Sequence, residues 1–286
     1  MFFKKIKSKI IFFSTLSISF FHSVSFSNDT CDPYSEIQEQ RCLKRIEVLD
    51  LSNKKIKNIE EYFRSNDIDI QSVNVLNLNH NKIEDITYLS YFKNLRDLLL
   101  QDNKISVIPD SFANLTHLQT LDLSNNDITE IPDSFFQLTN LKVLVLNQNK
   151  LKWIPGNISQ LINLEELYLN GKSRRTMKSS CFGFFGFQHG EISSIPESLT
   201  TLTKLRILDL SHNRISDIPD SFYNLTKLMD LDISDTAVSI LPDFLLDKRS
   251  NIFINYAETP FAHTLRVNKY IGKVYEEYYI RKTGLI

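Results

Sequence analysis

The sequence has 286 residues, of which 42% are hydrophobic and 23% charged, and this composition excludes a wholly disordered chain. The formal net charge is −1, but four lysines at positions 4, 5, 7 and 9 carry +4, so the rest of the chain carries −5. An acidic body argues against general nucleic-acid binding, which requires a basic face.

The segment 1–27 has the order of a secretory signal peptide. The early lysines precede an apolar stretch of about a dozen residues, and Ser25 and Ser27 then offer the small residues of a cleavage site. The apolar stretch is shorter than the roughly 20 residues of a membrane-spanning helix. We therefore predict cleavage near Ser27 and export to the periplasm or beyond, with a retained membrane anchor as the alternative.

Residues 28–45 are expected to form an N-terminal cap helix, because Asp32 suits the N-cap and Pro33 the first helical position. Cys31 and Cys42 lie within this segment, and an exported protein favours a disulfide. About ten helical residues between them rise about 15 Å, whereas bridged Cα atoms lie within about 7 Å. A bridge therefore requires a shorter or broken helix, and the pairing stays open.

An eleven-residue pattern, L-x-x-L-x-L-x-x-N-x-L, occurs eight times with a modal period of 23 residues. Leucines at positions 4 and 6 alternate with other residues, as in a short half-buried strand. One such strand cannot hide its apolar side, so we predict that the copies stack into a parallel sheet over one continuous core. The copies begin at Ile46, Val73, Leu95, Leu118, Leu141, Leu164, Leu205 and Leu228.

Asparagine stands at position 9 of five copies. A short amide there can bond to the backbone where the chain turns off the strand, so we assign these residues a structural role. Lys54, Lys172 and Thr236 take position 9 in the other three copies, and their turns are expected to be less regular. The five asparagines are Asn81, Asn103, Asn126, Asn149 and Asn213.

The second half of most copies carries an Ile-Pro-x-x-Phe motif, in full at residues 108–112, 131–135 and 218–222. Proline has no N–H and a fixed φ, which suits the start of a short helix or an extended bend. The motif therefore predicts short helical or 3-10 turns on the convex side. Copies one and two lack this proline, so their backs are expected to differ.

Together, the two halves of the repeat resemble the leucine-rich repeat family over residues 46–242. The 23-residue Ile-Pro-x-x-Phe form is similar to that of bacterial secreted or effector proteins and of intracellular Ras-scaffold proteins. The resemblance implies an α/β solenoid, a curved horseshoe with a parallel concave sheet and short helical or 3-10 turns on its convex side. It also makes the concave face the expected binding surface.

The sixth copy carries an insertion at residues 171–190, since the pattern breaks off after its strand and resumes only at Ile192. The basic first half of the insertion precedes four phenylalanines, which do not belong in an ordinary solvated loop. Three interpretations remain: packing against the solenoid edge, a partner-binding loop, or contact with a membrane surface or a phosphate. The candidate binding residues are Arg174, Arg175, Phe182, Phe184, Phe185 and Phe187.

Positions 3, 5 and 7 of each copy are predicted to point outward on the concave side. They place an apolar stripe beside the insertion, followed by an acidic end. A contiguous apolar stripe on this face indicates a binding site, and a partner with an apolar centre and a basic flank fits it. The candidate residues on the sheet are Leu99, Val143, Val145, Tyr168, Ile207, Asp209 and Asp232.

Residues 243–286 are expected to form a C-terminal cap, because a solenoid must cover the core of its last repeat. Ile252 and Ile254 suggest a degenerate ninth strand. Residues 270–280, which are rich in tyrosine, predict a closing helix.

The sequence predicts a non-enzymatic, monomeric and exported module that binds a protein partner through the concave face and the insertion. It has no phosphate-binding loop, H-E-x-x-H or G-x-S-x-G motif. Three sparse cysteines give no metal-site spacing, and no cofactor, metal or nucleic acid is expected. The alternatives are a cytoplasmic signalling scaffold and a repeat-guided effector enzyme, although the segment after Pro242 is short for a catalytic domain.

Overall fold

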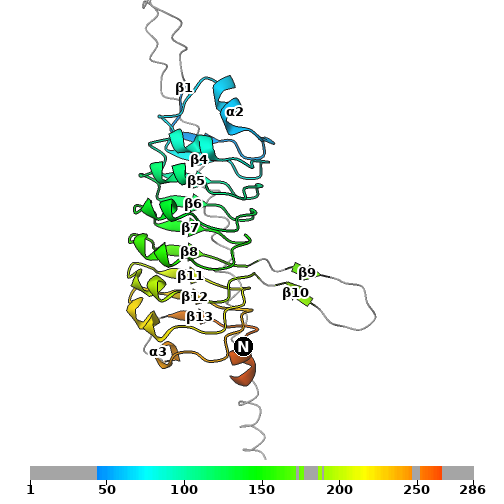
Figure 1. The fold of residues 1–286 in the computed structure, drawn as a ribbon, viewed down its shortest axis with the longest axis vertical. Coiled ribbons are helices and arrows are strands. Elements are labelled where there is room, and N and C mark those ends of the chain that lie inside the picture. The colour runs from blue at the N-terminus through cyan, green and yellow to red at the C-terminus, as the bar shows by residue number, and fades with distance from the viewer. Residues whose placement is uncertain (1–43, 172–173, 177–185, 189, 247–251, 266–286) are drawn as a thin grey trace, which may run out of the picture.

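The computed structural model describes residues 44–171, 174–176, 186–188, 190–246 and 252–265. Nine short strands pair in parallel to form one sheet, in which each strand lies beside the strand of the next repeat (Figure 1). The strands are β2 (Val48–Asp50), β4 (Val75–Asn77), β5 (Asp97–Leu99), β6 (Thr120–Asp122), β7 (Val143–Val145), β8 (Glu166–Tyr168), β11 (Ile207–Asp209), β12 (Asp230–Asp232) and β13 (Phe253–Asn255). The predicted parallel solenoid is confirmed, and β13 contains Ile254 of the predicted ninth strand.

The strands pair without a shift in register, so that equivalent positions of all repeats face one another. Leu121, for example, pairs with Leu98 on one side and with Leu144 on the other. The leucines at position 4 of the eight copies are at most 8% exposed, and they join those at position 6 in one core cluster. The alternation of inward and outward residues is therefore as predicted.

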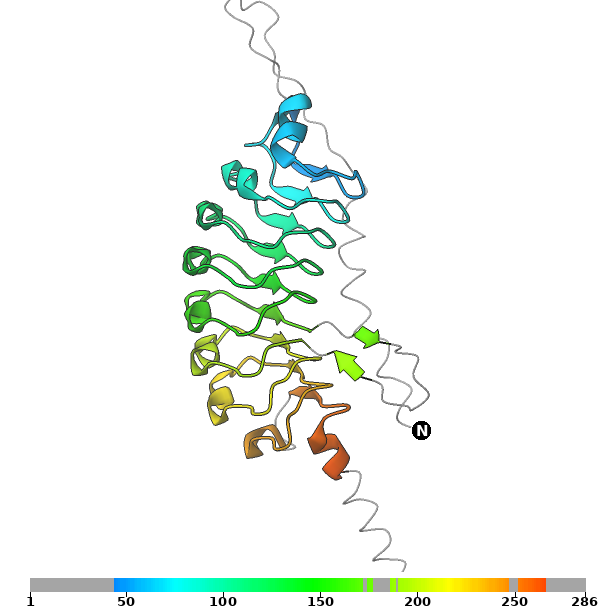
Figure 2. The same ribbon diagram turned by 45° about the vertical axis from the view of Figure 1, so that its right-hand side comes forward.

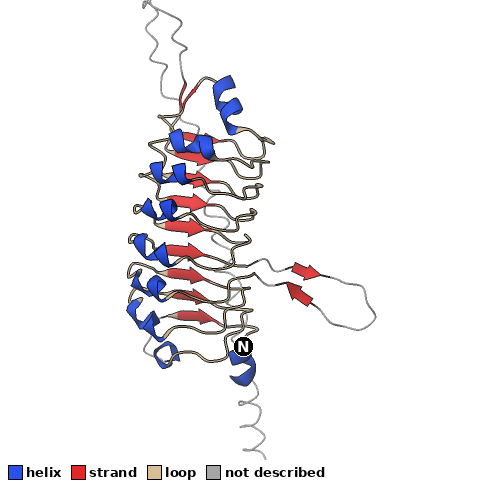
Figure 3. Cartoon of the chain, viewed as in Figure 1, coloured by secondary structure: helices blue, strands red, loops and turns tan. Residues whose placement is uncertain are grey.

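The side of the solenoid opposite the sheet consists of short helices (Figure 3). Five of the 3-10 helices follow a proline whose φ lies between −74° and −58° and whose carbonyl accepts the first hydrogen bond of the helix. The predicted 3-10 turns are confirmed, with proline in extended backbone just before the helix. The helices are η3 (Thr87–Tyr91), η4 (Asp110–Asn114), η5 (Asp133–Gln137), η6 (Gly156–Gln160), η7 (Glu197–Thr201) and η8 (Asp220–Asn224).

The two copies without the proline differ from each other. Copy one has an α-helix on its back, α2 (Ile59–Ser65), whose N-cap Asn58 accepts the N–H of Glu61 at 3.1 Å. Copy two forms the 3-10 helix η3 without a preceding proline. The expected difference is therefore present in copy one alone. A four-residue helix, α3 (Asp243–Leu246), follows Pro242.

The repeat asparagines form a ladder of backbone contacts along the turns. Nδ2 of Asn126 donates to the carbonyl of Leu123 at 3.0 Å and to that of Leu100, one repeat earlier, at 2.9 Å. Its Oδ1 accepts the N–H of Ile105 at 3.0 Å. The same three bonds recur at Asn81, Asn103 and Asn149, and the two donor bonds recur at Asn213. The predicted structural role of these residues is confirmed.

The turn of copy one, where Lys54 replaces the asparagine, is less regular than the others. Both Asn53 and Lys55 have positive φ values, of 60° and 61°, whereas copies two to five and seven and eight have one such residue each, at position 8. The segment before this copy forms β1 (Lys44–Arg45), which pairs with β3 (Ile68–Asp69).

The expected ends of the chain fall mostly outside the described residues. This applies to the signal peptide at 1–27, to the cap helix as far as residue 43 with its two cysteines, and to the closing helix at 270–280. At the C-terminal end of the described chain, a helical segment begins at Pro260.

Candidate functional site

The outward side chains of the nine strands form two rows across one side of the sheet, which we call the concave face. Position 3 gives the first row and position 5 the second, because the strands pair in register. The first row is Val48, Val75, Asp97, Thr120, Val143, Glu166, Ile207, Asp230 and Phe253. The second row is Asp50, Asn77, Leu99, Asp122, Val145, Tyr168, Asp209, Asp232 and Asn255.

Four of the predicted apolar contact residues, Val143, Val145, Tyr168 and Ile207, come together on β7, β8 and β11. Val145 pairs directly with Tyr168, and all four side chains are half-buried. Glu166, however, stands between Val143 and Ile207 in the first row, and it accepts a hydrogen bond from the Tyr168 hydroxyl at 2.9 Å. The stripe therefore has a carboxylate in its middle.

Leu99 differs from the other predicted contact residues on the sheet because it is buried. It is 8% exposed, and its neighbour in the row, Asn77, is 9% exposed. The second row of the face therefore offers little accessible surface at β4 and β5. The expectation that Leu99 offers a contact is not supported by its burial.

Three of the four acidic residues at position 5 share one local geometry. Oδ1 of Asp209 accepts both the backbone N–H of Ser211, at 2.9 Å, and its hydroxyl, at 2.6 Å. Asp122 and Asp232 bind the serines two residues after them in the same way. These bonds fix each carboxylate at the point where the chain leaves its strand.

Burial and like charges act against the ionised form of Asp122 and Asp209. Burial raises the pKa of Asp209, and the nearby Asp232 raises it further, while the bonds from Ser211 lower it. Burial also raises the pKa of Asp122. The pKa of Tyr168 lies above its usual range because of burial first and the Glu166 carboxylate second. The Tyr168 hydroxyl therefore stays protonated and acts as a donor.

Glu166 and Asp230 also belong to the site, although the outward pattern places them at position 3 without making them candidate contact residues. Each belongs to the first row, and Ile207 lies between them. Glu166 precedes the insertion in sequence and Ile207 follows it, so their pairing depends on the insertion being left out of the sheet. In the sequence, the resumption of the repeat after Gly190 indicates that the strands of Glu166 and Ile207 are neighbours.

The insertion contains two paired strands, β9 (Arg174–Thr176) and β10 (Gly186–Gln188), which run antiparallel with Arg175 opposite Phe187. Both views place them beyond the carboxyl-terminal edge of the sheet and not over its strands (Figures 1 and 2). The backbone positions of Arg174, Arg175 and Phe187 therefore lie beside the sheet and not above it. The remaining predicted residues, Phe182, Phe184 and Phe185, lie outside the described residues.

Two glycines hold the root of the insertion. Gly171 donates its N–H to the carbonyl of Ser211 at 2.9 Å, and Gly190 donates to that of His212 at 2.7 Å. A Cβ on Gly171 would clash with the His212 carbonyl oxygen, and one on Gly190 would clash with Oδ1 of Asn213. Only glycine permits this close approach, so the chain leaves and re-enters the repeat at one place.

The position-9 residue of copy six is Gly190, although the sequence pattern assigns this position to Lys172. Elsewhere the N–H at position 10 bonds to the carbonyl at position 11 of the preceding copy, as Lys104 does to Ile83. Arg214 makes this bond to Ile192, which is therefore position 11 of copy six. The insertion thus lies between positions 8 and 9.

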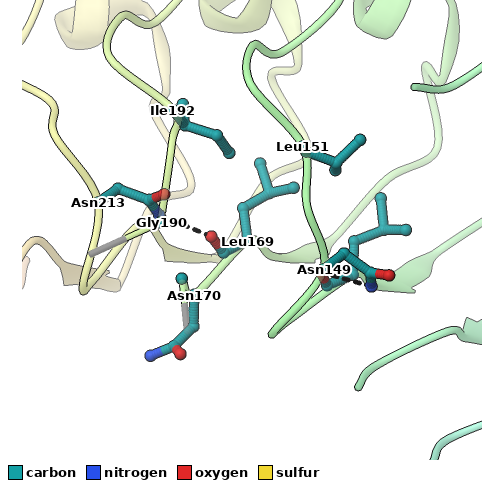
Figure 4. Close-up of a pocket in the computed structure, with 9 residues that line it drawn as sticks. Asn149, Leu151, Leu169, Asn170, Gly190, Ile192 and Asn213 are labelled. Atoms are coloured by element: carbon teal, nitrogen blue, oxygen red, sulfur yellow. Dashed lines mark hydrogen bonds between the residues drawn. The ribbon is translucent and has the colours of Figure 1, made fainter. Parts of the chain in front are cut away.

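A small cavity of about 10 Å³ lies where the asparagine ladder is interrupted (Figure 4). In Figure 4, Asn149 and Asn213 lie on two sides of it with Leu169 and Asn170 between them, and both glycines of the root also line it. Gly190 has no side chain to continue the ladder. The space fits about one water molecule and is far smaller than a ligand pocket of roughly 300–1,000 Å³.

The described part of the chain shows neither a metal cluster nor a membrane-spanning helix. Among these residues, no group of three or more His, Cys, Asp and Glu side chains is arranged to hold a metal ion. The helices of the same residues are all too short or too polar to cross a bilayer.

Two family models match the sequence. One, described as a leucine-rich repeat region, matches residues 63–180, and the other, described as leucine rich repeat, matches residues 188–238. Between them they span both sides of the insertion. No curated relative matches the chain.

Solved structures with the same fold include bacterial and plant proteins. Internalin C2 of Listeria monocytogenes is 25% identical with a TM-score of 0.57, over 74% of this chain and 81% of that chain. The ectodomain of the Arabidopsis thaliana receptor kinase GASSHO1/SCHENGEN3, solved in complex with CASPARIAN STRIP INTEGRITY FACTOR 2, is 27% identical with a TM-score of 0.55, over 66% of this chain.

A leucine-rich repeat protein of Leptospira interrogans is 22% identical with a TM-score of 0.56, also over 66% of this chain, and shows the fold alone. The match spans half of the Leptospira chain and 22% of the receptor ectodomain. The repeat pattern, the sheet with its asparagine ladder, and both family models agree, and the chain therefore belongs to the leucine-rich repeat family.

Proposed function

We propose that this protein is a non-enzymatic interaction module, exported from the cell, that binds a protein partner through its concave face and the insertion. Leucine-rich repeat domains generally mediate protein–protein interactions, and the similar receptor ectodomain was solved in complex with a named factor. The observation that carries the proposal is the pair Val145 and Tyr168. Both side chains are half-buried, so each keeps part of its surface accessible on the concave face, and the insertion follows the strand of Tyr168.

The proposed contact area combines an apolar centre with charged surroundings. Val143 and Ile207 extend the apolar pair, and Asp209 and Asp232 form its acidic side. In the insertion, the two arginines at 174 and 175 are suited to bidentate contacts with a carboxylate or phosphate. The four phenylalanines add the aromatic surface that often anchors interfaces.

The non-enzymatic assignment is supported by the shape of the site. An open sheet face excludes little water, whereas catalysis needs groups that are held rigidly in a shielded pocket. The cavity at the root of the insertion is too small for a substrate. The scattered histidines of the sequence add no recognised catalytic motif.

Export rests on the order of basic, apolar and small residues in the segment 1–27. N-terminal sequencing of the protein from the periplasm or medium is expected to begin close to Asn28. An intact Met1 in a soluble cytoplasmic pool contradicts the export part of the proposal and favours the scaffold alternative.

Binding is tested by quantitative pull-down with the mature chain and three variants. Tyr168→Ala is expected to weaken capture by about fivefold or more, since it truncates an aromatic anchor. Deletion of residues 172–189 is expected to abolish capture. Val75→Ala, a half-buried residue on the distant strand β4, serves as the matched control. Unchanged capture by a folded deletion variant contradicts the role of the insertion.

A further inference from the structure

The charge on the concave face is one-sided. Its eighteen outward positions carry seven carboxylates and no Lys, Arg or His, although the chain contains 33 Lys and Arg residues. In the described part of the chain, none of the seven takes part in an ion pair with Lys or Arg. The carboxylates are Asp50, Asp97, Asp122, Glu166, Asp209, Asp230 and Asp232.

The carboxylates of the second row flank the apolar pair on both sides. Along that row the order is Asp122, Val145, Tyr168, Asp209, on four consecutive strands. Neighbouring strands are about 4.8 Å apart, so the two aspartates are separated by about 14 Å. Glu166 adds a further negative group beside the pair.

The fold does not require these two charges. Asn77 and Asn255 take position 5 in other repeats and accept the same backbone N–H, from Asn79 at 3.0 Å and from Ala257 at 3.3 Å. An asparagine thus makes the same type of turn bond. The charge at Asp209 also faces Asp232 on the next strand. His212 is a nearby group that favours the charged form of Asp209, but neither Lys nor Arg pairs with this row among the described residues, and such a crowded row of carboxylates suggests a cation supplied from outside.

We propose that the concave face binds an extended basic segment of the partner, with Lys or Arg at residues i and i+4 and an apolar side chain at i+2. In an extended chain these three side chains share one face and span about 14 Å, which matches the separation of the two aspartates. The apolar side chain then rests on Val145 and Tyr168, and the cations reach Asp122 and Asp209. This inference rests on the proposed function and specifies its ligand.

The test uses a fluorescently labelled synthetic peptide in which arginine, serine, leucine, serine and arginine follow one another, flanked by glycine and serine. Fluorescence anisotropy with the full chain is expected to show binding that weakens as salt is raised. Replacing both arginines by glutamate, or placing them side by side, is expected to remove or clearly weaken binding. Equal binding of the glutamate or the rearranged peptide overturns the proposal.

The protein variants locate the contact. Asp122→Asn and Asp209→Asn keep the shape of the side chain and the turn bonds, and each is expected to weaken the arginine peptide about three- to fivefold. Asp97→Asn, on β5 away from the apolar pair, is the matched control and should change affinity less than about twofold. Equal losses in all three variants contradict the stated register.

The two proposals fail in different ways. If the arginine peptide does not bind but the natural partner is lost on Tyr168→Ala, the concave face is a binding surface and the basic segment is wrong. If the peptide binds and depends on Asp122 and Asp209, while deletion of residues 172–189 leaves partner capture unchanged, the basic segment stands. In that second case the insertion does not contribute to partner binding.

Discussion

Copies three to five and copy six form the turn after the strand with different residues and hydrogen bonds. In the regular copies an asparagine such as Asn126 joins its own strand to the preceding one through three buried bonds. In copy six, Gly190 takes that position, and two backbone bonds from the glycines hold the chain together. The comparison shows that a repeat can give up its ladder residue when the inserted segment enters and leaves between adjacent positions.

The largest expected effect tests whether the core continues through this change. Leu144 in copy five and Leu167 in copy six pair directly, and both are 0% exposed. Leu144→Ala and Leu167→Ala are each expected to lower the free energy of unfolding by about 2–5 kcal/mol, since each leaves a cavity in a packed core. Urea denaturation measures both. A much smaller loss at Leu167 contradicts a continuous core at the insertion.

The next effect compares two asparagines of the ladder. Asn126→Ala is expected to cost about 1–3 kcal/mol, because buried backbone groups on two repeats lose their partner. Asn213→Ala is expected to cost less, since it adjoins the cavity and water can enter to replace the lost bonds. Thermal and urea unfolding of the two variants give the comparison. A larger loss at Asn213 contradicts the proposed access of water.

Most of the fold follows from the sequence because its signals are repeated. Leucines at positions 4 and 6 specify the strand, its inward face and its register. Because the pattern occurs eight times, a wrong assignment in one copy can be recognised by comparison with the others. The pattern assigns position 9 of copy six to Lys172 because a linear pattern counts residues from the start of the strand. The resumption of the pattern at Ile192 indicates that the count restarts after the insertion, and the bond between Arg214 and Ile192 fixes Ile192 as position 11.

The candidate site follows less completely from the sequence. The pattern correctly groups Val145 with Tyr168, since alternation decides which residues face outward. It does not predict the burial of Leu99, which depends on how neighbouring side chains cover a face that is nominally exposed. The pattern places Glu166 outward at position 3, but a search for apolar contact residues passes over this carboxylate, which lies between Val143 and Ile207.

A smaller effect is expected from restoring the regular turn. Deleting residues 172–189 joins Gly171 and Gly190 as positions 8 and 9 of a regular turn, in which position 9 of the other copies carries a side chain without the clash present at Gly190 beside the insertion. Adding Gly190→Asn then supplies the missing ladder residue. Position 8 has a φ of 51–60° in the other copies, which glycine adopts freely. The combined variant is expected to exceed the simple deletion in stability by about 1 kcal/mol, through the new hydrogen bonds. Calorimetry of the two deletion variants tests this, and a lower stability of the combined variant contradicts the ladder assignment.

The smallest effect concerns the charge of Asp209. The groups that face it are Tyr168 on β8, Asp232 on β12, and Ser211 and His212 on its own repeat. Burial, followed by Asp232, raises its pKa in the folded protein above the ordinary value of 3.8. A raised pKa means that folding favours the protonated form, so this group's contribution to stability is present below pH 3.8 and is lost as the pH rises through the folded pKa.

Asp209→Asn removes that dependence while keeping an oxygen to accept the bonds from Ser211. At pH 7 the variant is therefore expected to be as stable as the wild type or more stable, by less than about 1 kcal/mol. As the pH falls towards 3.8, the wild type gains relative to the variant, and the difference closes. Urea denaturation of both proteins at the two pH values measures the change. A variant that is clearly less stable at pH 7 means that the carboxylate stabilises the fold, and the argument that its charge is retained for a basic ligand then loses its basis.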